Sequence, residues 1–195
     1  VKNYQIKNIK VLDECFVLNK KHVLDICDLL IKRNYKLNIW AYARIDTVDE
    51  ELLEKLKQAG FNWLCYGIES ANLDVRSQVA KSDFGQEDIK RVIKMTKDAG
   101  INILGNFMFG LPDDNLETMQ ETLDLAKELN CEYTNFYATM AYPGSDLFEE
   151  AIKNKVRLPE IWRGYAAFSE ECIPLPTKCV SAEEVLRFRD KAFVE

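Results

Sequence analysis

The sequence contains a single histidine, His22, among its 195 residues. A Ser-His-Asp triad or a Cys-His pair needs a histidine as its base, and this one falls in the expected first turn of a helix near the N-terminus. The chain also lacks a Gly-rich phosphate loop, a Walker sequence, an HExxH motif and a GxSxG motif. These absences argue against nucleophilic hydrolases, zinc peptidases and P-loop NTPases.

Long apolar runs and an excess of positive charge are absent too. No window of about 18 consecutive apolar residues occurs, and the N-terminal VKNYQIKNIK does not resemble a signal peptide, so we expect a cytoplasmic protein without a membrane span. The net charge of −6 argues against a broad nucleic-acid surface. The chain starts with Val rather than Met, and we therefore expect it to be part of a longer protein.

Closely spaced cysteine pairs are missing. None of the cysteines has the spacing of a zinc knuckle or a redox motif, and disulfides are not expected in a cytosolic chain. Most are predicted to be small buried hydrophobes rather than ligands, with Cys172 and Cys179 as surface or packing residues. The six positions are Cys15, Cys27, Cys65, Cys131, Cys172 and Cys179.

What is present is an alternation of short apolar runs and amphipathic stretches. This order predicts an α/β fold with a parallel sheet and with helices on one outer face, and five strands are too few to close an eight-stranded barrel. Residues 73–88 are predicted to be a polar connection. The expected strands are Ile6–Leu12, Leu37–Ala43, Phe61–Tyr66, Ile101–Phe109 and Glu132–Met140.

Helix boundaries are marked by capping residues. Asn19 and Asn115 are expected N-caps, and capping boxes are expected at 47–50 and 181–184. The hexapeptide KQAGFN at 57–62 is echoed by KDAGIN at 97–102, each spanning a helix end and the next strand. Such repeated units favour a parallel sheet.

Polar residues gather where the expected strands end. In parallel α/β folds these positions face the ligand site, and acids, a base and amides together suit a zwitterionic ligand. Glu69 is either such a site residue or a solvated loop acid, and hydrolysis by two carboxylates also stays open. The positions are Asp13, Glu14, Arg44, Asp46, Glu69, Ser70, Asn106–Gly110 and Tyr137–Tyr142.

The series VLDECFVLNKKHVLDIC, AYARID, YGIESAN, NFMFGLP and YPGS resembles the radical S-adenosylmethionine (radical SAM) enzymes, especially the branch that often carries an N-terminal cobalamin-binding domain. The resemblance implies a partial (β/α) barrel, strands two to six of six, within residues 1–155. Residues 156–195 are then expected to be an aromatic-rich extension packed on the barrel, a weaker match.

The family pattern also implies how SAM is held. Arg44 would be a polar contact, Glu69 and Ser70 would meet the methionine or ribose portion, and Asp13 and Glu14 would lie where the amino group binds. Further contacts would be Lys81 with the carboxylate, Asn106 with the ribose, and the backbone near Gly110, Tyr137 and Met140 with adenine.

The sequence departs from the family in one respect. The CxxxCxxC segment that holds the [4Fe–4S] cluster is missing, so we expect a truncated core that is inactive alone. The alternative is a cluster-less binding or scaffold domain. The resemblance implies SAM, a cluster and, in this branch, cobalamin for the whole enzyme, with a flavodoxin or ferredoxin as electron donor. It leaves the small-molecule substrate open, and we expect the exposed first strand to promote dimerisation.

Overall fold

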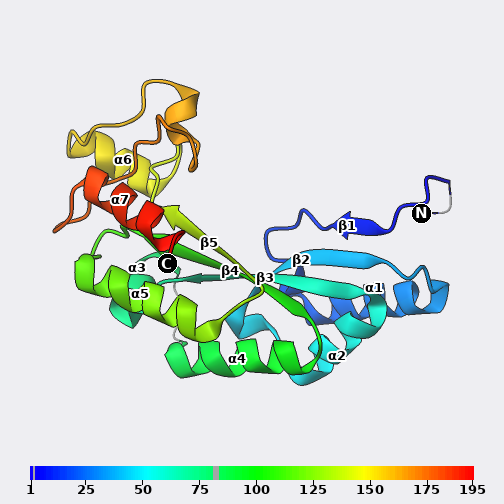
Figure 1. Ribbon diagram of the computed structural model, residues 1–195. Helices are drawn as coiled ribbons and strands as arrows, with labels where there is room; N and C mark the ends of the chain where they lie inside the picture. Colours follow the sequence, from blue (N-terminus) through cyan, green and yellow to red (C-terminus); the bar gives the residue numbers. More distant parts are fainter. Residues whose placement is uncertain (2, 81–83) are drawn as a thin grey trace. The chain divides into compact units, whose positions relative to one another are not determined.

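The computed structural model describes residues 1, 3–80 and 84–195, with the side chains of 78–80 left undescribed. Its sheet has five strands whose spatial order follows the chain order (Figure 1). The first strand runs parallel to the second, and the second runs parallel to the third, as successive βα units require. The strands are β1 (Asn8–Lys10), β2 (Asn38–Arg44), β3 (Phe61–Glu69), β4 (Asn102–Phe109) and β5 (Tyr133–Ala138). All five predicted strands are therefore present, the first much shorter than expected.

The described residues fall into two compact units. The first lies within Val1–Ile68, Ser82–Asn106 and Glu128–Asn135. The second lies within Glu69–Lys81, Phe107–Lys127 and Phe136–Glu195. The predicted division of the chain near residue 155 stays a prediction.

In the first unit, three helices lie along one face of the strands (Figure 1). They are α1 (Lys20–Arg33), α2 (Glu50–Ala59) and α4 (Gln86–Asp98), and two single 3₁₀ turns, η1 (Phe16–Leu18) and η2 (Ile45–Thr47), connect strand to helix. In β2, Ile39, Ala41 and Ala43 are buried while Trp40 and Tyr42 between them are partly exposed. This alternation leaves the other face of the strand open to a ligand.

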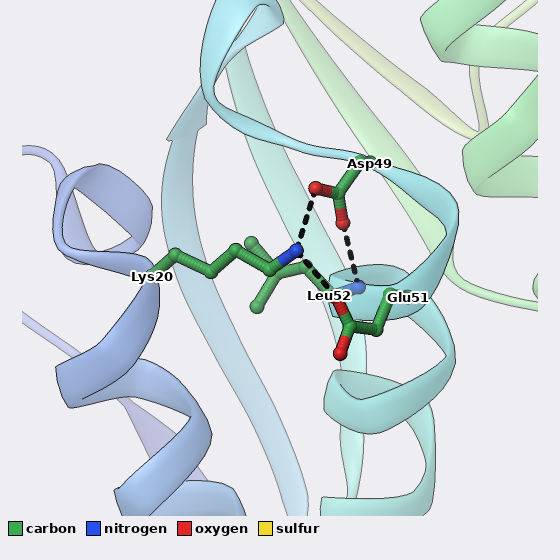
Figure 2. Close-up of polar contacts among 4 residues, drawn as sticks. All are labelled: Lys20, Asp49, Glu51 and Leu52. Atoms are coloured by element: carbon green, nitrogen blue, oxygen red, sulfur yellow. Dashed lines mark hydrogen bonds and ion pairs between the residues drawn. The ribbon is translucent and has the colours of Figure 1, made fainter.

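The N-terminus of α2 differs from the prediction. The expected capping box at Thr47 is wrong: Asp49 is the N-cap, and its carboxylate accepts from the Leu52 amide at 2.9 Å. Figure 2 shows the contacts of this cap. The ammonium of Lys20, at the start of α1, contacts Asp49 at 2.7 Å and Glu51 at 2.6 Å, so the ion pairs join the first turns of two helices. The Thr47 hydroxyl instead donates to the Arg44 carbonyl at 2.9 Å.

The predicted polar connection after β3 is partly helical. Leu73–Ala80 forms α3 and α4 begins at Gln86, so the segment predicted as a polar connection contains one helix and the start of the next. The helix has little apolar periodicity because one of its inward residues is Arg76, which is fully buried beside Val75. Because a buried arginine is part of the inner face, that face cannot be identified from apolar residues alone.

The second unit is organised around phenylalanines. Besides α3 it contains most of α5 (Leu116–Leu129), α6 (Asp146–Lys153), the 3₁₀ turn η3 (Trp162–Tyr165) and α7 (Ala182–Ala192). Phe109 stacks on Phe136 at 5.4 Å between ring centroids and meets Phe188 edge-on at 4.9 Å. The predicted caps Asn115 and Ser181 are both confirmed. No helix in the described part of the chain is both long enough and apolar enough to cross a membrane.

The echoed hexapeptides have a structural reason. The ammonium of Lys57 donates to the carbonyl of Gly100 at 2.6 Å, and that of Lys97 donates to the carbonyls of Leu129 and Asn130 at 2.9 and 2.7 Å. Each lysine therefore reaches the C-terminal end of the following long helix, where unpaired carbonyls concentrate negative charge.

Replacing either lysine should weaken this packing. Lys57→Met and Lys97→Met keep most of the aliphatic stem and remove the donor, so each should lower the free energy of unfolding by about 1 kcal/mol. Urea unfolding measures the change. Lys94→Met is the matched control, because Lys94 forms only an exposed pair with Asp98, and it should change stability by less than about 0.5 kcal/mol. Equal losses in all three variants would contradict the capping role.

Candidate functional site

Side chains on the open face of the first unit form rows that run across the strands. Strand register pairs Lys10 with Trp40 and Trp40 with Trp63, and two residues further along it pairs Tyr42 with Cys65. We call Lys10, Trp40 and Trp63 the aromatic row. The next row towards the carboxyl ends of the strands is polar and consists of Tyr42, Cys65, Asn106 and Asn135.

Asn106 lies at the centre of the polar row. Its amide nitrogen donates to the sulfur of Cys65 at 2.9 Å, and its amide oxygen accepts from Asn135 at 3.1 Å. One neighbour on each side fixes the orientation of the amide. One N–H hydrogen and one oxygen lone pair remain for a ligand, so Asn106 can both donate and accept.

The other predicted residues of the first unit are exposed and lie near strand ends. Arg44 forms two hydrogen bonds to Asp46, at 2.9 and 2.7 Å, and this guanidinium lowers the pKa of the Asp46 carboxyl. The Asp13 carboxylate accepts from the Cys15 amide at 3.0 Å, and Glu14 is exposed. A ligand that uses Arg44 must therefore compete with Asp46.

Glu69 is the first residue of the second unit and the last of β3. Its backbone has φ 64°, a left-handed conformation that is uncommon for a residue with a side chain. Burial raises the pKa of its carboxyl to about 7, because the charged form loses hydration. A strained backbone and a perturbed acid at a strand end are typical of functional sites.

Ser70 is predicted to contact the ligand, and the structure shows its hydroxyl engaged inside the protein. The side chain is fully buried, and its oxygen lies 3.2 Å from the Thr122 hydroxyl. Thr122 also accepts from the Ala71 amide at 3.0 Å, and Arg76 donates to the Ser70 carbonyl at 2.5 Å. Residues of α3 and α5 thus hold the turn that follows Glu69.

Gly110 follows β4 with φ 79° and leads into a loop in which Leu111 and Asp114 are buried. The Asp114 carboxylate accepts from the Leu111 amide at 3.0 Å and from the Thr118 hydroxyl at 2.7 Å. Burial raises the pKa of Asp114. These bonds fix the course of the backbone after Gly110, where the family pattern places adenine contacts.

Tyr137 and Met140 follow in and after β5. Tyr137 is half-buried, with its ring 5.4 Å from that of Phe168, and Met140 is buried with its sulfur 3.7 Å from the Cys172 sulfur. Cys27, Cys65 and Cys172 are buried as predicted, whereas Cys15 and Cys131 are partly exposed and Cys179 is exposed.

The predicted site residues are thus divided between the two units. Asp13, Glu14, Arg44 and Asn106 belong to the first, and Glu69, Ser70, Gly110, Tyr137 and Met140 to the second. Lys81 lies outside the described residues. Among the residues that are described, no three His, Cys, Asp or Glu side chains are grouped to hold a metal ion. The side chains described here therefore do not fit a metal cluster.

Sequence reasoning missed the partners of the predicted residues. Cys65, Asn135, Thr122 and Arg76 were not predicted to have any role beyond packing or connection. For Cys65 and Asn135 the sequence held a signal, because side chains two residues apart in a strand point to the same face. Cys65 follows Trp63 by two residues, and Asn135 follows Tyr133 by two residues. For Thr122 and Arg76 no local signal existed.

Comparison with known proteins identifies a family and several relatives of this chain. A model described as the radical SAM superfamily matches residues 5–126. An uncharacterized methyltransferase of Pyrococcus horikoshii is 31% identical over 98% of this chain and 41% of its own length. The anaerobic magnesium-protoporphyrin IX monomethyl ester cyclase of Rubrivivax gelatinosus is 29% identical over 77% of this chain and 27% of its own length. The chain thus spans less than half of each relative.

A solved structure supports the fold. The radical SAM methyltransferase TsrM of Kitasatospora setae, with cobalamin and a [4Fe–4S] cluster bound, superposes with a TM-score of 0.69. It is 21% identical and is matched over 93% of this chain and 37% of that one. The predicted fold class, a partial (β/α) barrel of this type, is confirmed.

Proposed function

Because the chain belongs to the radical SAM superfamily, we propose that it is the SAM-binding part of an iron-sulfur enzyme of that superfamily. The observation that carries the proposal is the match over residues 5–126, which includes β1 to β4 and the turns that follow them. Polar groups at the ends of these strands suit a ligand that carries an ammonium, a carboxylate and ribose hydroxyls.

The residue roles follow the chemistry of each side chain. Glu69 and Ser70, at the turn held by Thr122 and Arg76, would meet the methionine or ribose portion, and Asn106 would bind ribose hydroxyls. Asp13 and Glu14 would face the amino group, with Arg44 as a further polar contact and Lys81 on the carboxylate. Backbone groups at Gly110, Tyr137 and Met140 would flank adenine. A lysine paired with a carboxylate is a strong charge-assisted contact.

The cluster chemistry would come from other residues. The side chains described here do not fit a cluster, so we infer that this chain alone binds SAM without cleaving it. In the whole protein a [4Fe–4S] cluster, reduced by a flavodoxin or ferredoxin in the cytoplasm, would supply the radical chemistry. The methyltransferase relative and the cobalamin-bound structure support methyl transfer as the outcome.

Calorimetric titration with SAM tests this proposal. We expect saturable binding, weakened about tenfold in Glu69→Ala because a charge-assisted hydrogen bond contributes on the order of 1.5 kcal/mol. Glu117→Ala is the control, since Glu117 is an exposed acid of α5, and it should bind SAM as the parent does. Absence of saturable binding, or equal loss in both variants, would contradict the proposal.

The alternative function is a cluster-less ligand-binding or scaffold domain that uses the same strand-end residues without catalysis. Iron and sulfide analysis after anaerobic reconstitution should find no stoichiometric cluster in this chain under either reading. A longer form of the protein decides between them, because only the enzyme would gain a cluster and cleave SAM when residues bearing CxxxCxxC are included.

A further inference from the structure

The open face of the first unit contains a hollow of about 550 Å³ at the amino-terminal halves of the strands. It is lined by residues of all five strands, among them Lys10, Trp40, Trp63, Leu104 and Tyr133. None of the predicted SAM contacts that the structure describes lines it. Its volume is in the range of small-molecule sites.

Two indole rings dominate the lining. Trp40 and Trp63 are register partners on adjacent strands, both half-buried, and Leu104 and Tyr133 extend the same surface. Trp40 also meets Tyr42 edge-on, with ring centroids 4.5 Å apart, which limits how its indole can turn. Rigid aromatic faces of this kind favour a planar conjugated ligand that can stack on them.

Among the residues that the structure describes, Lys10 is the one charged residue in the lining, and no acid lines the hollow. The Lys10 ammonium lies over the Trp40 ring, 4.3 Å from its centroid, and 5.6 Å from the centroid of Tyr42. Asn8 and Asn38 also line the hollow, and the Asn38 amide donates to the Asn8 amide oxygen at 2.9 Å. A cation beside aromatic walls, without a carboxylate in the lining, favours an anionic ligand.

We propose that this hollow binds a planar, conjugated carboxylate, stacked against Trp40 and Trp63 with its acid group at Lys10. That this ligand is the substrate of the enzyme rests on the function proposed above, whereas the binding itself does not. Arg44, at the carboxyl end of β2, lies four residues beyond Trp40, or roughly 13 Å along the strand. A substrate that fills the hollow and also reaches the strand ends must therefore be extended, which favours several fused or linked rings.

The test uses pyrene-1-carboxylate as probe, with pyrene-1-methanol and cyclohexanecarboxylate as the uncharged and the aliphatic comparison compounds. Calorimetry on this chain should show one saturable site for pyrene-1-carboxylate and weaker binding of both others. Trp63→Leu should weaken binding about tenfold, as loss of one aromatic stacking partner does. Lys10→Met should weaken the carboxylate about fivefold, to the level of the alcohol, and leave the alcohol unchanged.

Two controls match these variants. Lys7→Met removes an exposed lysine just before β1 that does not line the hollow, and Trp162→Leu removes an exposed tryptophan of the second unit. Both should bind the probe as the parent does. If Trp63→Leu fails to fold, judged by its circular dichroism and melting, Trp63→Phe and Lys10→Met carry the test. The proposal is overturned if the probe does not saturate, or if the controls lose as much binding as the variants.

Three further outcomes are distinguishable. If light scattering detects a dimer that Trp63→Leu dissociates, the hollow is an interface between copies of this chain, and the proposal fails. If the chain binds SAM but not the probe, the proposed ligand site in the hollow is wrong and the proposed function is unaffected. Probe binding without SAM binding overturns the proposed function and leaves the hollow as a ligand site.

Discussion

Gly110→Ala should lower the free energy of unfolding by about 3 kcal/mol, from two costs that act together. With φ 79° the backbone is in the left-handed region, where a Cβ alone costs about 1–2 kcal/mol. A Cβ here would also lie 2.6 Å from Cγ1 of Val185, on α7, and overpacking of that kind costs about 1–3 kcal/mol. Urea or thermal unfolding measures the sum.

Two comparison variants separate the costs. Gly144 has φ 85° but nothing within 4 Å of its added Cβ, so Gly144→Ala should lose only the conformational share, about 1 kcal/mol. In a Val185→Ala background the clash is removed, and Gly110→Ala should then cost about as much as Gly144→Ala. If Gly110→Ala and Gly144→Ala are equally destabilising in the parent, close packing of α7 on the end of β4 does not constrain Gly110.

The residues that set local structure were predictable from the sequence, because their partners lie within a few positions. Asn19 bonds the His22 amide three residues on, and Ser181 and Glu184 form a reciprocal capping box. Gly60 ends α2 in the left-handed conformation expected of a helix-terminating glycine. Where two local candidates compete, prediction failed: the Thr47 hydroxyl bonds to Arg44 within the preceding 3₁₀ turn, and Asp49 caps the helix instead.

The same distinction applies to the candidate site. The strand ends bear the polar residues that parallel topology predicts, so Glu69 and Asn106 could be proposed from spacing. The conformations of these two side chains could not be predicted from the sequence. Cys65 meets Asn106 because β3 and β4 are adjacent, and the register of β2 on β3 shifts at Ile39/Trp40, which no local pattern encodes. The turn after Glu69 likewise depends on Arg76 and Thr122, from two helices.

Glu69 should make the protein less stable as the pH rises from about 4.5 to about 7. Burial raises the pKa of the folded-state carboxyl from its usual 4.5 to about 7, so in this window the folded chain holds a proton that the unfolded chain has released. Fewer protons bound in the unfolded state mean that the free energy of unfolding falls with increasing pH. The fall should amount to about 3 kcal/mol and should level off above pH 7, since each unit is worth about 1.4 kcal/mol.

Urea unfolding at a series of pH values checks this result against Glu69→Gln, which cannot ionise and should lose that share of the pH dependence. Glu117→Gln, at an exposed helical position, should retain the pH dependence of the parent. The same titration bears on SAM. A carboxylate that accepts hydrogen bonds from the ligand or faces its positive charge must be ionised in the complex, so SAM affinity should increase with pH up to about 7 in the parent, because that is the pKa of Glu69. It should not do so in Glu69→Gln. A parent whose SAM affinity is flat over this range would place Glu69 outside the SAM contacts, even if its effect on stability is as expected.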